Sequence, residues 1–205
     1  MAKATRRIKG KKKRWFQIIA PKAFKEQILG EAYLYEPSSA IGRPLKINLM
    51  NLTGDIKRQN INIRFRINSA KEGKLYAGIT GYEIMTTAIK RMVRRRSSKI
   101  LLSFTIETSD NKQIRIKPVI LTRGRVKQSI LTKLRKTAEE LIREEAKKST
   151  YEKMLDNIVN HKLQTDIKKH LKKIHPIRVV EIKELFLKQK KELEKPKAKT
   201  VKTSG

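Results

Sequence analysis

The side chains with the clearest chemical potential are basic, and the densest group of them lies between residues 82 and 96. Apolar residues recur there at helical spacing, which predicts an amphipathic helix with a charged outer face. Basic residues at the end of a helix suit its dipole, but three consecutive arginines repel one another more than this effect compensates. We therefore expect a polyanion to neutralise the candidate phosphate ligands Lys90, Arg91, Arg94, Arg95 and Arg96.

The alternative for this helix is internal pairing, in which Arg91 and Arg94 form ion pairs with acidic residues of the same chain. The acidic candidates are Glu139, Glu140 and Glu144. The two interpretations differ in consequence, because internally paired arginines belong to the fold whereas unpaired ones are available to phosphate.

Both ends of the chain are also basic and nearly devoid of apolar residues. Segments 1–14 and 188–205 cannot bury enough surface to fold alone, so each is predicted to be a tail that stays disordered until a partner binds. Trp15 follows the first tail and can stack on a base or ribose, but residues 15–19 can equally begin the core, which we favour for most of them. The candidate RNA-binding residues outside the helix are Arg6, Arg7, Lys9, Lys11, Lys12, Lys13, Arg14, Trp15, Arg43, Arg123, Arg125, Lys195 and Lys197.

The overall charge indicates a nucleic-acid partner. The 205 residues include 51 lysines and arginines against 19 aspartates and glutamates, which gives a formal net charge of +32. Such a charge opposes compaction, whereas phosphates supply counter-charge and release counterions on binding. A membrane is disfavoured because no apolar run approaches the roughly 18 residues of a spanning helix. The N-terminus lacks the features of a secretory signal, so we expect a cytoplasmic protein.

Catalysis and cofactor binding are not indicated. The chain has no cysteine and three histidines, so thiolate chemistry is absent and zinc lacks its usual ligands. The carboxylates Asp55, Glu72, Glu83, Asp110 and Asp166 are scattered, and their spacing predicts no metal or acid–base site. We therefore expect no enzyme activity, no cofactor, no metal and no small-molecule substrate.

The first half of the chain is predicted to be mainly β. Alternation of apolar and polar residues, or a run of large apolar ones, predicts strands at 45–52, 61–67, 75–80, 99–105 and 113–121. Residues 71–74 suit a hairpin connection, and Pro118 indicates an edge strand or a bulge. A short helix is predicted at 23–29.

Beyond residue 125 the hydrophobic period changes from two to about 3.6, which predicts helices. A long helix ends near Lys148, a capping box at 149–152 starts a shorter one, and a third stops before Pro176. The predicted class is α+β, with tails at 1–14 and 188–205 around a single domain at 15–187, mainly β at 15–122, mainly helical at 126–175, and with a final strand at 177–187.

Four segments together resemble a known family: residues 13–24, 41–52 and 166–176, and the basic helix ending at Met92 and Val93. Their order and spacing are similar to those of the small-subunit ribosomal protein of archaea and eukaryotes called eS-one, formerly S-three-A-e, in its shorter, archaeal-length form. The resemblance implies a β-barrel-like antiparallel core followed by packed helices. It also implies a structural role in the small ribosomal subunit, on the platform near the mRNA exit and the 3′ end of the ribosomal RNA.

The partners implied by the resemblance are small-subunit ribosomal RNA, neighbouring platform proteins, and mRNA near its exit. An aromatic content of 5% favours recognition of folded RNA through its backbone over stacking on individual bases. The alternative function is that of a free RNA-binding factor or RNA chaperone in ribosome assembly or translation, because it explains the charge almost as well.

Overall fold

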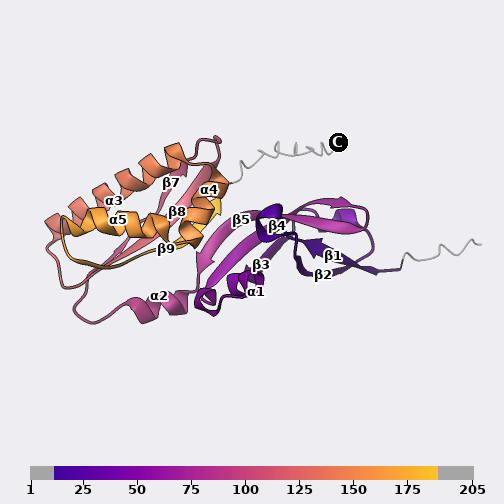
Figure 1. The fold of residues 1–205 in the computed structure, drawn as a ribbon, viewed down its shortest axis with the longest axis horizontal. Helices are drawn as coiled ribbons and strands as arrows, with labels where there is room; N and C mark the ends of the chain where they lie inside the picture. The colour runs from indigo at the N-terminus through magenta and orange to yellow at the C-terminus, as the bar shows by residue number, and fades with distance from the viewer. Residues whose placement is uncertain (1–11, 189–205) are drawn as a thin grey trace, which may run out of the picture.

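The computed structural model describes residues 12–188, which form the elongated molecule of Figure 1. One half holds the first five strands, and the other holds the remaining strands together with the three longest helices. The tail predictions for residues 1–11 and 189–205 lie outside the described residues.

The described strands form one open, mixed sheet. In chain order they are β1 (Arg14–Ile19), β2 (Ile28–Leu34), β3 (Pro44–Asn48), β4 (Ile61–Lys71), β5 (Lys74–Ile84), β6 (Lys99–Leu101), β7 (Phe104–Glu107), β8 (Gln113–Thr122) and β9 (Ile177–Leu187). The main path of neighbours is β2-β1-β5-β9-β8-β6. β4 pairs with β5 and with β3, and β7 pairs with β8.

The prediction of a barrel-like antiparallel core is wrong in two respects, although the α+β class is confirmed. β1 runs parallel to β5, with Gln17 opposite Lys74 and Ile19 opposite Tyr76. The sheet also stays open. β4 pairs with β5 along the whole length of β5, whereas β1 pairs with the start of β5 and β9 pairs with its end. The sheet therefore branches at β5 instead of closing on itself.

The two halves join where β9 meets the end of β5. The pairing runs from Gly81 opposite Phe186 to Glu83 opposite Glu184. A Cβ atom at position 81 would lie 2.6 Å from the carbonyl oxygen of Leu185 and 2.9 Å from Cδ1 of Phe186. Because real Cβ atoms do not come so close to another backbone, glycine is what allows β9 to approach β5 here.

Two carboxylates lie opposite each other at this junction and are neutralised by cations. Arg64 binds Glu83 with an Nη2 to Oε2 distance of 2.6 Å, and the Lys117 ammonium binds Glu184. Partial burial alone would raise the pKa of each carboxyl, but these hydrogen bonds, with those of neighbouring lysines, hold both pKa values below the usual range. The Phe186 ring lies between the two cations, 4.6 Å from Cζ of Arg64 and 5.8 Å from Nζ of Lys117.

The helices of the described region pack mainly on the second half of the sheet. They are α1 (Leu49–Thr53), α2 (Thr86–Met92), α3 (Gln128–Lys148), α4 (Tyr151–Val159) and α5 (Lys162–Lys172), with short 3₁₀ turns η1 (Lys22–Phe24), η2 (Pro37–Ala40) and η3 (Ile56–Arg58). α3 and α5 lie side by side, α5 against β9 and α3 against β7 (Figure 1). Leu134, Ala138 and Ile142 form the buried stripe of α3. None of the described helices is both long and apolar enough to span a membrane.

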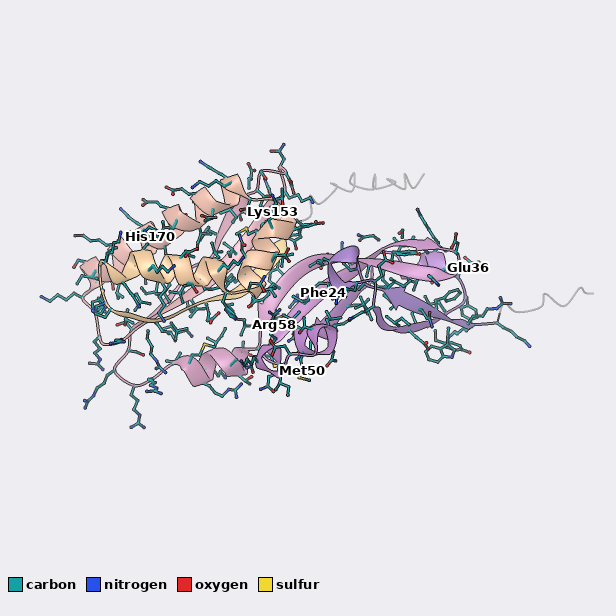
Figure 2. The ribbon with its side chains drawn as sticks, viewed as in Figure 1. Phe24, Glu36, Met50, Arg58, Lys153 and His170 are labelled. Carbon is teal, nitrogen blue, oxygen red and sulfur yellow. The ribbon has the colours of Figure 1, made fainter. Side chains whose placement is uncertain are left out.

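One cluster of buried apolar side chains extends through both halves and includes Phe65, Tyr82 and Leu134. A second contact between the halves is made by Arg58, which Figure 2 labels near the middle of the molecule and whose Nη2 donates to Oδ1 of Asn160 at 3.4 Å. Together with the sheet, these contacts make the described region continuous across the junction.

Several sequence predictions are confirmed. Residues 61–67 and 113–121 lie in β4 and β8, and the final strand at 177–187 is β9. The hairpin at 71–74 forms with positive φ angles at Glu72 and Gly73, as a two-residue turn between twisted strands requires. The long helix ends at Lys148, and Pro118 lies at a register shift between β8 and β9, which is the bulge that its missing N–H favours.

The predicted helix at 82–96 is wrong at both ends. Tyr82 and Ile84 belong to β5, because both side chains are buried at strand spacing. Both residues pair with β4, and Tyr82 also pairs with β9. The helix α2 ends at Met92, since Val93 is extended with ψ 128°. Arg94 and the two arginines after it therefore lie in a loop beyond the helix.

Other boundaries also differ from the predictions. The strand expected at 99–105 is split into β6 and β7, and the one expected at 45–52 ends at Asn48, whose side chain caps α1. The helix expected at 23–29 is only the short turn η1, followed by β2. The residue that caps α4 is Thr150, one position later than the predicted capping box, and its hydroxyl accepts from the Lys153 amide at 3.5 Å.

We expect the substitution Gly81→Ala to weaken the junction between the two halves. The new methyl group must displace the β9 backbone, at a cost of about 1–3 kcal/mol in the free energy of unfolding. Gly124→Ala is the matched control, because a Cβ there has no neighbour within 4 Å. Urea unfolding followed by circular dichroism should separate the two variants, and equal stabilities would contradict this account of Gly81.

Candidate nucleic-acid interface

Two loops meet at the end of the molecule remote from β1 and β2 and carry five of the predicted phosphate ligands. The ligands, all exposed, are Arg94, Arg95 and Arg96 after α2, and Arg123 and Arg125 after β8. A shallow hollow of about 410 Å³ is lined by Arg96, Arg123, Gly124 and Arg125 and brings the two segments together. We call residues 94–96 and 123–125 the arginine loops.

The arginine loops are held together by hydrogen bonds around Thr122, the last residue of β8, which is fully buried. Its hydroxyl accepts from the Ser98 amide at 2.9 Å and lies 2.6 Å from the carbonyl oxygen of Gly124. The Ser98 hydroxyl in turn accepts from the Val126 amide at 3.2 Å. The Arg123 amide donates to the carbonyl of Pro176 at 3.1 Å, which fixes the second loop to the start of β9. The two loops are therefore fixed relative to each other before any ligand binds.

The alternative of internal ion pairs for Arg91 and Arg94 is not found within residues 12–188. Arg91 donates to Oδ1 of Asn60 at 2.8 Å, and Glu139 binds Arg143. Within residues 12–188, none of the five arginines of the arginine loops forms an ion pair with a carboxylate. This contrasts with Arg64 and Lys117, whose charges are used within the sheet. The charges of the arginine loops are therefore available to an external anion.

A second exposed group lies at the opposite end, on β1 and β2. Trp15 is 66% exposed and is therefore outside the core expected for most of residues 15–19, whereas Phe16 is half-buried and Ile18 is buried. Tyr33 lies opposite Trp15 in the β1–β2 pairing, and Tyr35 follows β2. We call Trp15, Tyr33 and Tyr35 the aromatic ridge.

The remaining predicted ligands are distributed over the surface. Lys12, Lys13 and Arg14 are exposed beside the aromatic ridge. Lys90 and Arg91 are exposed on α2, before the first arginine loop, and Arg43 is exposed in the turn after η2, in the first half of the molecule. The structure does not bring Arg43 to either group. Arg6, Arg7, Lys9, Lys11, Lys195 and Lys197 lie outside the described residues.

Sequence reasoning did not identify Tyr33 and Tyr35. Both are exposed, and they lie two positions apart, which places them on one side of an extended segment. Together with Trp15 on the neighbouring strand they form one surface. The pattern was present in the sequence, but the pairing of β1 with β2 was needed to connect it to Trp15.

The half-exposed His161 and the partly buried Glu181 form a polar pair with no evident catalytic arrangement. Burial raises the pKa of Glu181 to about 7, an effect that Lys168 partly opposes, and burial together with Arg58 lowers the pKa of His161. The His161 Nδ1 and Glu181 Oε2 atoms are 3.7 Å apart, but a histidine with a lowered pKa is uncharged at neutral pH, so this contact is not an ion pair. In the part of the chain that the structure describes, no group of three metal-ligating side chains occurs.

Comparisons with known proteins show the family to which the chain belongs. The model of the Ribosomal S3Ae family matches residues 2–190. A protein of Haloarcula marismortui named small ribosomal subunit protein eS1 is 32% identical over 180 residues, which cover 88% of this chain and 84% of the relative. Proteins of the same name from Sulfolobus acidocaldarius and Sulfurisphaera tokodaii are 35% and 34% identical, over 90% and 87% of this chain and 94% and 93% of their own lengths.

These matches identify the chain as a ribosomal protein of the small-subunit type. It belongs to the Ribosomal S3Ae family. The resemblance of residues 13–24, 41–52 and 166–176 and of the basic helix had indicated this family. Membership in this family also agrees with the expectation that the chain is not an enzyme.

We expect Thr122→Val to loosen the arginine loops. The substitution keeps the shape of the side chain but leaves the partly buried Ser98 amide without its acceptor, which costs about 1 kcal/mol. Amide hydrogen exchange at Ser98 should accelerate, and the unfolding midpoint should fall. Thr132→Val on the exposed face of α3 is the control, since its hydroxyl only donates back to the Gln128 carbonyl. If exchange at Ser98 is the same in both variants, Thr122 does not fix the loops.

Proposed function

We propose that the chain is a structural constituent of the small ribosomal subunit in the cytoplasm and that it binds small-subunit ribosomal RNA through the arginine loops. The observation that carries this proposal is the set of five exposed arginines that form no ion pair within residues 12–188, on two segments held together by Thr122. Guanidinium groups bind phosphate oxygens with paired, planar hydrogen bonds. Loops that are already fixed lose little conformational freedom on binding, so more of the contact energy appears as affinity.

We further propose a location on the platform of the subunit, near the mRNA exit and the 3′ end of the ribosomal RNA. Membership in the Ribosomal S3Ae family supports this location. The elongated shape of Figure 1 also supports it, because the exposed basic residues 12–14 and the arginine loops lie at opposite ends and can reach different partners. Neighbouring platform proteins, and mRNA near its exit, are the further partners of this location.

The alternative, a free RNA-binding factor or chaperone, predicts weaker retention. An integral constituent should remain with small subunits that have been washed in moderate salt, whereas a factor should leave as its phosphate contacts are screened. Sedimentation of washed subunits, followed by detection of this chain, distinguishes the two. Cross-linking of the retained chain to RNA should then give contacts at residues 94–96 and 123–125, and cross-links to other segments alone would contradict the proposed interface.

We expect the double substitution Arg96→Glu and Arg123→Glu to impair binding to folded small-subunit RNA without unfolding the protein. Exposed charges change stability by about 0.5 kcal/mol or less, whereas reversal beside phosphate replaces attraction with repulsion. The slope of log affinity against log salt should also fall in magnitude by about 0.7–0.9 for each lost phosphate contact.

The matched control is Lys147→Glu with Lys153→Glu, which makes the same change in net charge. Both lysines are exposed, and the helix α3 separates Lys147 from the arginine loops by about 30 Å at 1.5 Å per residue. If the control weakens binding as much as the arginine reversal does, net charge and not this interface governs the affinity.

A further inference from the structure

The aromatic ridge is an unusual surface for a protein whose composition favours backbone recognition. Trp15 and Tyr33 are 66% and 51% exposed, and Tyr35 is 57% exposed. The opposite face of the same two strands is normal core, with Ile18 and Leu34 buried. The rings are therefore not needed to bury this end of the sheet, and the described residues leave more than half of each side chain exposed.

The geometry of the rings suits flat ligands. The Trp15 and Tyr33 centroids are 4.9 Å apart and the rings are tilted by 37°, so they touch without covering each other's outer faces. The Lys13 ammonium lies 5.6 Å from the Tyr33 centroid and 5.0 Å from that of Tyr35. A positive charge is thus held within the row of rings.

The charges around the ridge suit phosphate. Lys12 and Arg14 flank Lys13 and are exposed, and residues 1–11, which lead into them, contain five further lysines and arginines and no acid. Glu31, which pairs with Gln17, lies further along β2 and is outnumbered by these cations. Rings interleaved with cations bind bases by stacking and the connecting phosphates by charge, as in single-strand binding surfaces.

We propose that the aromatic ridge binds unpaired bases of a single-stranded RNA segment, with Lys13 and Arg14 on its phosphates. Bases inside a duplex are stacked on one another and their faces are inaccessible to a protein ring, so the ridge selects single strands. This inference rests on the proposed RNA-binding function, but it concerns a different surface and a different form of RNA. The arginine loops contact phosphates whether or not the bases are paired.

The sequence supplies a direct reporter, because Trp15 is the only tryptophan of the chain. The full chain is titrated with a ten-nucleotide oligouridylate and, separately, with an RNA duplex of the same length, while tryptophan emission and RNA anisotropy are recorded. We expect saturable quenching of Trp15 by the single strand and little quenching by the duplex, although both bind.

Substitutions in the aromatic ridge and in the arginine loops show which of the two surfaces binds each RNA. Tyr33→Ala should weaken binding of the oligouridylate about 5- to 100-fold, as loss of one stacking partner does, and should leave duplex binding unchanged. Ile41→Ala, which truncates an exposed apolar side chain outside the ridge, should change neither. Arg96→Glu with Arg123→Glu should weaken duplex binding while preserving quenching by the bound single strand. Circular dichroism of each variant checks that the fold is intact.

The outcomes separate this inference from the proposed function. Binding of both RNAs without a change in Trp15 emission, or an unchanged single-strand affinity in Tyr33→Ala, overturns the stacking site and leaves the arginine loops as the RNA interface. Failure of the chain to bind either RNA contradicts the proposed function as well. If RNA-free small-subunit proteins quench Trp15 and oligouridylate does not, the ridge binds a protein and the inference is wrong.

Discussion

The close approach of β9 to β5 at Gly81 is the contact on which the rest of the structure depends. The pairing there is short, from Gly81 to Glu83, yet it makes two half-sheets into one. A side chain at position 81 would collide with the β9 backbone. The same junction brings Glu83 opposite Glu184, an unfavourable pair of like charges that Arg64 and Lys117 convert into a favourable network around the Phe186 ring. The distance between the arginine loops and the aromatic ridge is set by this junction.

Two groups of basic residues in the described region have different physical roles. One group, which includes Arg64 and Lys117, is partly buried, touches carboxylates and an aromatic ring, and stabilises the sheet. The other, which includes Arg96 and Arg123, is exposed and has no carboxylate partner within the described residues. A net charge alone does not distinguish these groups, because the assignment depends on which acidic residues the fold brings near each cation.

Hydrophobic periodicity predicted the elements whose pattern has one interpretation, such as β4, β8 and α3. The pattern of residues 177–187 suits a helix as well as a strand, and the strand that we favoured forms as β9. Periodicity predicted the helix α2 but misplaced its start, because Tyr82 and Ile84 fit a strand as well as the first turn of a helix, and pairing with β4 decided the outcome. The open sheet was not predictable, since the parallel pairing of β1 with β5 depends on contacts between distant segments. At the candidate interface, the arginines were identified because basic residues are dense in the sequence there. That Tyr33 lies beside Trp15 could be known only from the pairing of β1 with β2.

The late position of β9 in the chain affects how the nascent protein folds during synthesis. β9 is the last element of the described region, and it pairs with both β5 and β8, which are made much earlier. Pairings between distant segments form slowly, because the entropy of closing a long loop opposes them until the contacts are complete. While the nascent chain lacks this strand, part of one edge of β5 has no partner and the faces that β9 covers stay exposed, a state prone to association with other chains. A chain that terminates before residue 177 therefore carries an unfinished edge in the middle of its sheet.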